Sequence, residues 1–73
     1  METIGNRAYK EIKNRARENG ISPSKEAMKL LADSRLLSAW KRDTNPSAYY
    51  LQQMSLAGYD VIYILTGRRQ GDA

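Results

Sequence analysis

The chain contains neither cysteine nor histidine among its 73 residues. Without cysteine it forms no disulfide bond and offers no thiolate metal ligand, and without histidine it lacks the commonest zinc ligand and general base. So short a chain also buries only about 60% of the surface that its unfolded form exposes. We therefore expect a single small domain, stabilised by packing alone, that binds no metal or cofactor and is not an enzyme.

A long apolar run is also missing. The longest, from Val61 to Leu65, is far shorter than the ~20 residues that a membrane-spanning helix requires. The polar N-terminal residues lack the apolar core of a signal peptide. We therefore expect a cytoplasmic protein with no membrane partner.

Positive charge is present and is unevenly placed along the chain. The net charge is +4, of which residues 1–24 carry +2, residues 25–42 carry +3 and residues 43–73 carry −1. A concentrated basic surface on a small domain favours a polyanionic partner such as nucleic acid, although ordinary proteins also carry a charge of this size.

Apolar residues recur at helical spacing in five segments of the chain. Asn19-Gly20 is expected to end the first helix, and Ser22-Pro23 and Asn45-Pro46 are expected to begin the second and fourth. Asp60 is expected to cap the fifth, which Gly67 ends. The expected helices span residues 4–19, 23–31, 34–42, 46–57 and 61–66, with Asp33 or Ser34 as the cap of the third.

One face of each expected helix carries the side chains that should form the core. The expected core residues are Ile4, Ala8, Ile12, Ala16, Ala27, Leu30, Leu31, Leu37, Trp40, Ala48, Tyr50, Leu51, Met54, Ala57, Val61, Ile64 and Leu65. The basic residues of the first helix lie on its other faces, where we expect a solvated surface with long-range attraction for polyanions. They are Arg7, Lys10, Lys13, Arg15 and Arg17.

The second and third helices have the lengths and the tight connection of a helix-turn-helix. In such a motif the first helix crosses the nucleic-acid backbone and the second enters the major groove. Small or apolar residues must stand where the helices touch, and Ala27, Leu31 or Ala32, Leu37 and Trp40 have that spacing.

Three stretches resemble the lambda-repressor-like helix-turn-helix family, which includes phage Cro and the Xre-type DNA-binding domains of prophage repressors. Gly20-Ile21-Ser22 is similar to the stretch that enters the family motif. Residues 37–42 are similar to the stretch that ends its recognition helix. The stretches 46–51 and 57–69 resemble the segment that closes these domains. The resemblance implies a compact all-α, five-helix domain over residues 1–73, with the motif at about 23–42 and a flexible tail at about 68–73.

The sequence departs from the family pattern at three positions of the motif. Leu31 stands where glycine usually opens the turn, and Glu26 where an apolar residue is usual. Pro23 replaces a polar residue that commonly touches phosphate.

The resemblance also implies which residues contact DNA. Those expected to contact bases are Ser34, Arg35, Ser38 and Ala39. Those expected to contact phosphates are Lys25, Lys41, Arg42, Thr44 and Asn45. Arginine can bind both O6 and N7 of guanine, which makes Arg35 the leading candidate for base recognition. A surface for a second copy is expected at Tyr59, Ile62 and Tyr63.

These features together favour a sequence-specific transcription regulator, expected to be a Cro-like phage or prophage repressor. It would occupy a double-stranded DNA operator as a homodimer, formed in solution or only on DNA, in the nucleoid of a bacterial cell. The alternative is a helix-turn-helix scaffold that binds a host or regulatory protein as an antitoxin, anti-activator or anti-repressor.

Overall fold

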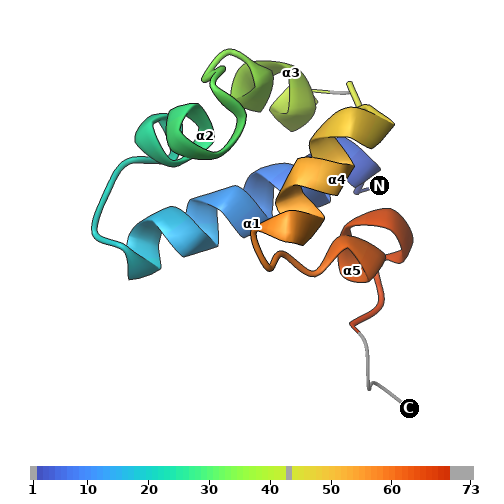
Figure 1. Cartoon of the computed structure of the whole chain (residues 1–73). Coiled ribbons are helices and arrows are strands. Elements are labelled where there is room, and N and C mark those ends of the chain that lie inside the picture. The colour runs from blue at the N-terminus through green and yellow to red at the C-terminus, as the bar shows by residue number, and fades with distance from the viewer. Residues whose placement is uncertain (1, 43, 70–73) are drawn as a thin grey trace.

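The computed structural model describes residues 2–42 and 44–69, which form five α-helices and no β-strand (Figure 1). The helices are α1 (Ile4–Glu18), α2 (Pro23–Leu31), α3 (Leu36–Arg42), α4 (Ala48–Leu56) and α5 (Val61–Thr66). The radius of gyration is 11.4 Å, which agrees with the value of about 11 Å expected for a compact chain of this length. The expectation of a compact all-α chain is confirmed.

Helix α1 runs through the middle of the molecule (Figure 1). It packs against α2, α3 and α5, whereas α4 packs against α2 and α5. A capping box begins α1, because Thr3 Oγ1 accepts the Asn6 N–H at 3.0 Å and Asn6 Oδ1 accepts the Thr3 N–H at 3.2 Å. The helix ends at Asn19-Gly20 as expected, with Gly20 in the left-handed region.

Two helices begin later than the sequence predicted. Helix α3 begins at Leu36 rather than near Ser34, because the Asp33 carboxylate holds the preceding turn by accepting the Arg35 N–H at 2.9 Å. Helix α4 begins at Ala48 rather than at Pro46. The Asn45 side chain does not cap α4, because its Oδ1 accepts the Gly5 N–H at the start of α1.

The core brings together residues from all five helices and from the turn before α5. Its buried members are Ala8, Ile12, Ala27, Leu31, Leu37, Trp40, Met54, Tyr59 and Ile64. Trp40 is 1% exposed, and its ring meets the Tyr50 ring edge-on at a centroid distance of 6.0 Å. The backbones of α3 and α4 do not pack closely, and this ring contact joins the two helices through their side chains.

The prediction of a core position is wrong for three residues. Ala48 and Ala57 are exposed, and Leu65 keeps 42% of its surface. Ala48 is the first residue of the nine-residue α4 and Ala57 lies just beyond its last, while Leu65 belongs to the last turn of the short α5. A periodic pattern continues to the ends of a helix, whereas packing covers only the part that neighbouring elements reach.

Two arginines of α1 fasten the C-terminal part of the chain to this helix. Arg7 donates to the Ile64 carbonyl at 2.9 Å and the Leu65 carbonyl at 3.2 Å. Arg15 donates to the Ala57 carbonyl at 2.9 Å, in the turn between α4 and α5. These carbonyls lie at helix ends, where intrahelical partners are missing, so both arginines act as caps.

The expected flexible tail at residues 68–73 lies only in part within the described residues. Arg69 makes two 3.1 Å contacts with the Glu11 carboxylate, and its guanidinium lies 4.1 Å from the centre of the Tyr63 ring. The expectation of a loose tail is therefore wrong for Arg69. Residues 70–73 lie outside the described residues.

No helix in the described ranges combines the length and apolar character needed to cross a bilayer.

Candidate nucleic-acid interface

The connection between α2 and α3 consists of residues 32–35. Ala32 ends α2 in the left-handed region with a φ of 58°, and its N–H donates to the Met28 carbonyl at 2.9 Å. A residue with a Cβ rarely adopts this conformation, so the surrounding packing must hold it. The result is the short connection that a helix-turn-helix requires.

The four residues expected to contact bases differ in exposure. The Arg35 side chain is 92% exposed, and Ser38 is also exposed on α3. Ser34 lies before the helix and is half-buried. Ala39 is half-buried and packs against the core, so little of it remains for a partner. Arg35 and Ser38 are therefore the two available members of this set.

Asp33 orients the Arg35 side chain. Its Oδ1 accepts from both the backbone N–H and the Nε–H of Arg35, at 2.9 and 3.3 Å. The backbone N–H, followed by the guanidinium, lowers the pKa of the Asp33 carboxyl below its ordinary value. This contact uses only Nε, and neither terminal guanidinium nitrogen of Arg35 has a hydrogen bond in the described part of the chain, which leaves both for an acceptor edge.

The five residues expected to contact phosphates all lie on the surface. Lys25, Lys41, Arg42 and Thr44 are exposed. Asn45 is exposed too, but its side-chain oxygen is bound to the Gly5 N–H, which leaves only its amide nitrogen for a phosphate. These residues lie in the first turn of α2, at the end of α3 and in the loop that follows.

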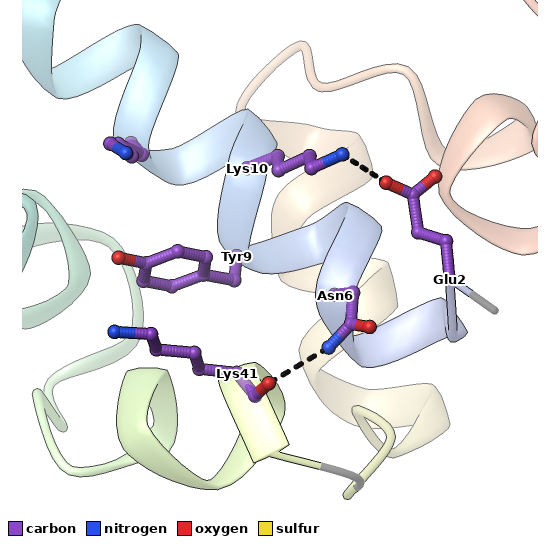
Figure 2. Close-up of a pocket in the computed structure, with 6 residues that line it drawn as sticks. Glu2, Asn6, Tyr9, Lys10 and Lys41 are labelled. Atoms are coloured by element: carbon purple, nitrogen blue, oxygen red, sulfur yellow. Dashed lines mark hydrogen bonds and ion pairs between the residues drawn. The ribbon is translucent and has the colours of Figure 1, made fainter.

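Two hollows beside α3 form what we call the Tyr9 groove. One, of about 380 Å³, is lined by Glu2, Asn6, Tyr9, Lys10, Lys13 and Lys41 (Figure 2). The other, of about 270 Å³, is lined by Tyr9, Pro23, Ser24, Leu37, Ser38 and Lys41. Both hollows are lined by Tyr9 and Lys41, so they adjoin at these two residues, between α1, α3 and the start of α2.

Positive charge predominates in the Tyr9 groove. The Lys41 ammonium lies 5.9 Å from the centre of the Tyr9 ring, while Lys10 pairs with Glu2, the one acidic residue of the lining. This pair lowers the pKa of Glu2 and raises that of Lys10, chiefly through their hydrogen bond. Within the described part of the chain, neither Lys13 nor Lys41 makes an ion pair.

This groove was not predicted from the sequence, because the basic residues of α1 were all expected to form one solvated face. A signal was present, since Lys13 stands three residues after Lys10 and four residues after Tyr9, spacings that make it a neighbour of both on the helix surface. That α3 would place Lys41 opposite them was not readable from spacing.

A different hollow, of about 260 Å³, surrounds Glu26 and is lined also by Arg15, Asn19, Lys29, Leu30, Ala57 and Tyr59. Glu26 is only 5% exposed. Its Oε1 accepts from Asn19 Nδ2 and from the Tyr59 hydroxyl, each at 3.4 Å, while Oε2 has no hydrogen-bond partner in the described residues. Burial, followed by the charge of Glu26, raises the pKa of Tyr59 to about 12.

Of the three residues expected to form a surface for a second copy, two keep exposed area. Tyr59 is 7% exposed and its hydroxyl faces Glu26, so it is used within the chain. Ile62 is 52% exposed, and Tyr63 is half-buried beneath the Arg69 guanidinium. Other large apolar residues of α4 and α5 are exposed as well. They are Tyr49, Leu56 and Leu65.

Comparisons of the chain with protein-family models, with curated proteins and with solved structures find no match.

Proposed function

We propose that this protein binds double-stranded DNA sequence-specifically through a lambda-repressor-like helix-turn-helix formed by α2 and α3. The observation that carries the proposal is the exposed Arg35 and Ser38, presented beside a short turn and flanked by Lys41 and Arg42. A major groove admits an α-helix, and cations at its edges meet the phosphates on either side.

In this mechanism Arg35 reads a guanine. Its two terminal nitrogens donate to O6 and N7, while Nε keeps its bond to Asp33. The Asp33 carboxylate thereby holds the guanidinium plane in one orientation. Ser38, three residues after Arg35, has a shorter side chain, whose hydroxyl can donate or accept a hydrogen bond. Occupation of an operator in this way would regulate transcription by excluding other proteins, as a Cro-like repressor does.

The first experiment identifies the bound sequence and then removes Arg35. A random DNA pool is selected on the wild-type chain, and affinity for the selected duplex and for a scrambled one is measured at fixed salt. Arg35→Ala is expected to lower the ratio of the affinities for the selected and scrambled duplexes about tenfold, because one bidentate contact is missing. Arg17→Ala, which removes the same charge from an exposed site on α1, keeps the preference.

Wild-type affinities that are equal for the selected and scrambled duplexes would contradict sequence-specific binding. An Arg35→Ala variant that keeps the wild-type preference for the selected duplex would contradict base recognition by Arg35 but not sequence-specific binding itself.

Protein binding is the second candidate function, favoured by the exposed apolar side chains of α4 and α5, with Leu56 at 76% and Ile62 at 52%. Large apolar side chains exposed on two helices that are in contact can form a binding surface for a partner. We propose that a second copy of this chain, or a host or regulatory protein, covers them.

Sedimentation over a range of protein concentrations, with and without the selected duplex, tests self-association. Ile62→Asp is expected to weaken the dimer about tenfold, because a twofold interface places the new carboxylate in it twice. The matched control is Gln52→Asp, which places a carboxylate at an exposed polar position of α4. A wild-type chain that stays monomeric on and off the duplex would exclude the homodimer.

A further inference from the structure

The basic residues of α1 fall into two groups with different surroundings. Arg7 and Arg15 donate to backbone carbonyls around α5, so their guanidinium groups are already used within the fold. Lys10 and Lys13 donate to no carbonyl among the described residues and line the Tyr9 groove with Lys41. The fold therefore explains Arg7 and Arg15, whereas the lysines of the groove, like the exposed Arg17, have no such role in the described residues.

Three ammonium groups around one concave site repel one another unless an anion joins them. Glu2 offsets one of these charges, by pairing with Lys10, so the described lining keeps an excess of two positive charges. Figure 2 shows the Tyr9 hydroxyl and the Lys41 ammonium extending toward the same side of the groove. The Lys10 ammonium extends the other way, toward Glu2. Ammonium and hydroxyl groups are donors, and the two that extend together, those of Lys41 and Tyr9, suit an anion with several acceptor oxygens, as phosphate has.

The shape of the groove indicates an extended ligand rather than a single ion. Beyond Tyr9 and Lys41, which line both hollows, the second hollow is lined by Ser24 at the start of α2 and by Ser38 on α3. Ser38 also belongs to the surface proposed to face the bases. A phosphate chain that lies in the groove is thus brought directly alongside α3.

We propose that the Tyr9 groove binds the phosphodiester backbone of the DNA strand that borders α3, with Lys10, Lys13 and Lys41 as phosphate ligands. This inference rests on the proposed function and adds a contact surface on α1. Glu2 competes with the phosphate for Lys10. Because the Glu2–Lys10 pair is exposed, with side chains 33% and 58% accessible, it is weak enough to be exchanged for a phosphate.

The test measures duplex affinity as a function of salt for Lys10→Ala and Lys13→Ala. Each variant is expected to bind the selected and scrambled duplexes about fivefold more weakly, because one charge contact is lost. Each also lowers the slope of log affinity against log salt by about 0.9, the value for one phosphate contact. The preference between the two duplexes stays unchanged, since phosphates carry no base identity.

Two further variants sharpen the test. Glu2→Gln is expected to tighten binding of both duplexes, because it frees Lys10 without removing a cation. Lys29→Ala removes the same charge as Lys10→Ala from the hollow around Glu26, outside the groove, and is expected to keep the wild-type slope. Circular dichroism of each variant verifies that the helices are intact.

A titration with inorganic pyrophosphate separates failure of this inference from failure of the proposed function. The groove predicts shifts of the Tyr9 ring and of the Lys10 and Lys13 amides in nuclear magnetic resonance spectra. If both lysine variants bind the duplex as the wild type does, with the same salt slope, the groove is not a backbone site although the protein binds DNA. If the wild type binds no duplex, both proposals fail, and shifts with pyrophosphate would then reassign the groove to a smaller phosphoanion.

Discussion

Replacing Gly5 by alanine is expected to lower the free energy of unfolding by about 1–3 kcal/mol, because overpacking forces the backbone apart. A Cβ at this buried position would lie 2.1 Å from the Thr44 carbonyl oxygen and 2.9 Å from the Trp40 carbonyl oxygen. Both obstacles are backbone atoms and cannot rotate away. Intrinsic helix propensity predicts the opposite sign, since alanine favours a helix interior over glycine by roughly 0.5–1 kcal/mol.

The damage extends to contacts that hold α3. The Gly5 N–H donates to Asn45 at 3.0 Å, and Asn6 Nδ2 donates to the Trp40 and Lys41 carbonyls at 3.0 Å each. Separation of α1 from the end of α3 weakens all three bonds, and these bonds position Lys41. We therefore expect DNA affinity to fall together with stability.

Urea denaturation followed by fluorescence measures this effect, because Trp40 is the only tryptophan and is buried. The control is Asn14→Ala, an exposed substitution in the same helix that should change stability by less than about 0.5 kcal/mol. A Gly5→Ala variant as stable as the wild type would show that α1 and α3 do not approach as closely as described.

Replacing Glu26 by methionine is expected to raise the free energy of unfolding by about 1–3 kcal/mol. The carboxylate is buried, has two 3.4 Å hydrogen bonds on one oxygen and no partner for the other in the described residues. Burial of a charge with so little compensation is costly, and apolar replacements of similar volume are often stabilising.

Glu26→Gln is the matched control, because it keeps the shape and removes only the charge. It should stabilise less than methionine, since a buried amide still needs partners. Denaturant midpoints of the three proteins decide the order. A loss of stability with methionine would indicate that Arg15 and Lys29 stabilise the carboxylate more strongly than its hydrogen bonds suggest.

The Tyr59 hydroxyl reports the charge of Glu26 independently of stability. Its pKa of about 12 should fall in both variants, because the negative charge of Glu26 helps to raise it. It should stay above the ordinary value, since burial is the larger cause. In the wild type, the raised pKa contributes stability that is fully present below about pH 10 and is lost as the pH rises toward 12. Ultraviolet titration of tyrosinate follows this step.

The sequence by itself determined the helices and most of their ends. Thr3, Ser22 and Asp60 act next to the backbone groups that they cap, and Gly20 and Gly67 adopt left-handed conformations at their own positions. These interactions involve residues a few positions apart, so a linear pattern contains them. For the same reason, the core residues in the middle of each helix, such as Ile12, Trp40 and Ile64, were predicted correctly.

Only the tertiary structure decided which polar residues belong to the fold and which remain for a partner. Arg7 and Lys10 look alike in sequence, yet one caps carbonyls 57 residues away and the other lines a groove. Tyr59 was expected on the surface and is buried against Glu26, and Gly5 is required by a carbonyl of the distant Thr44. Each of these outcomes depends on where another helix lies, and helical periodicity describes a single helix without its neighbours.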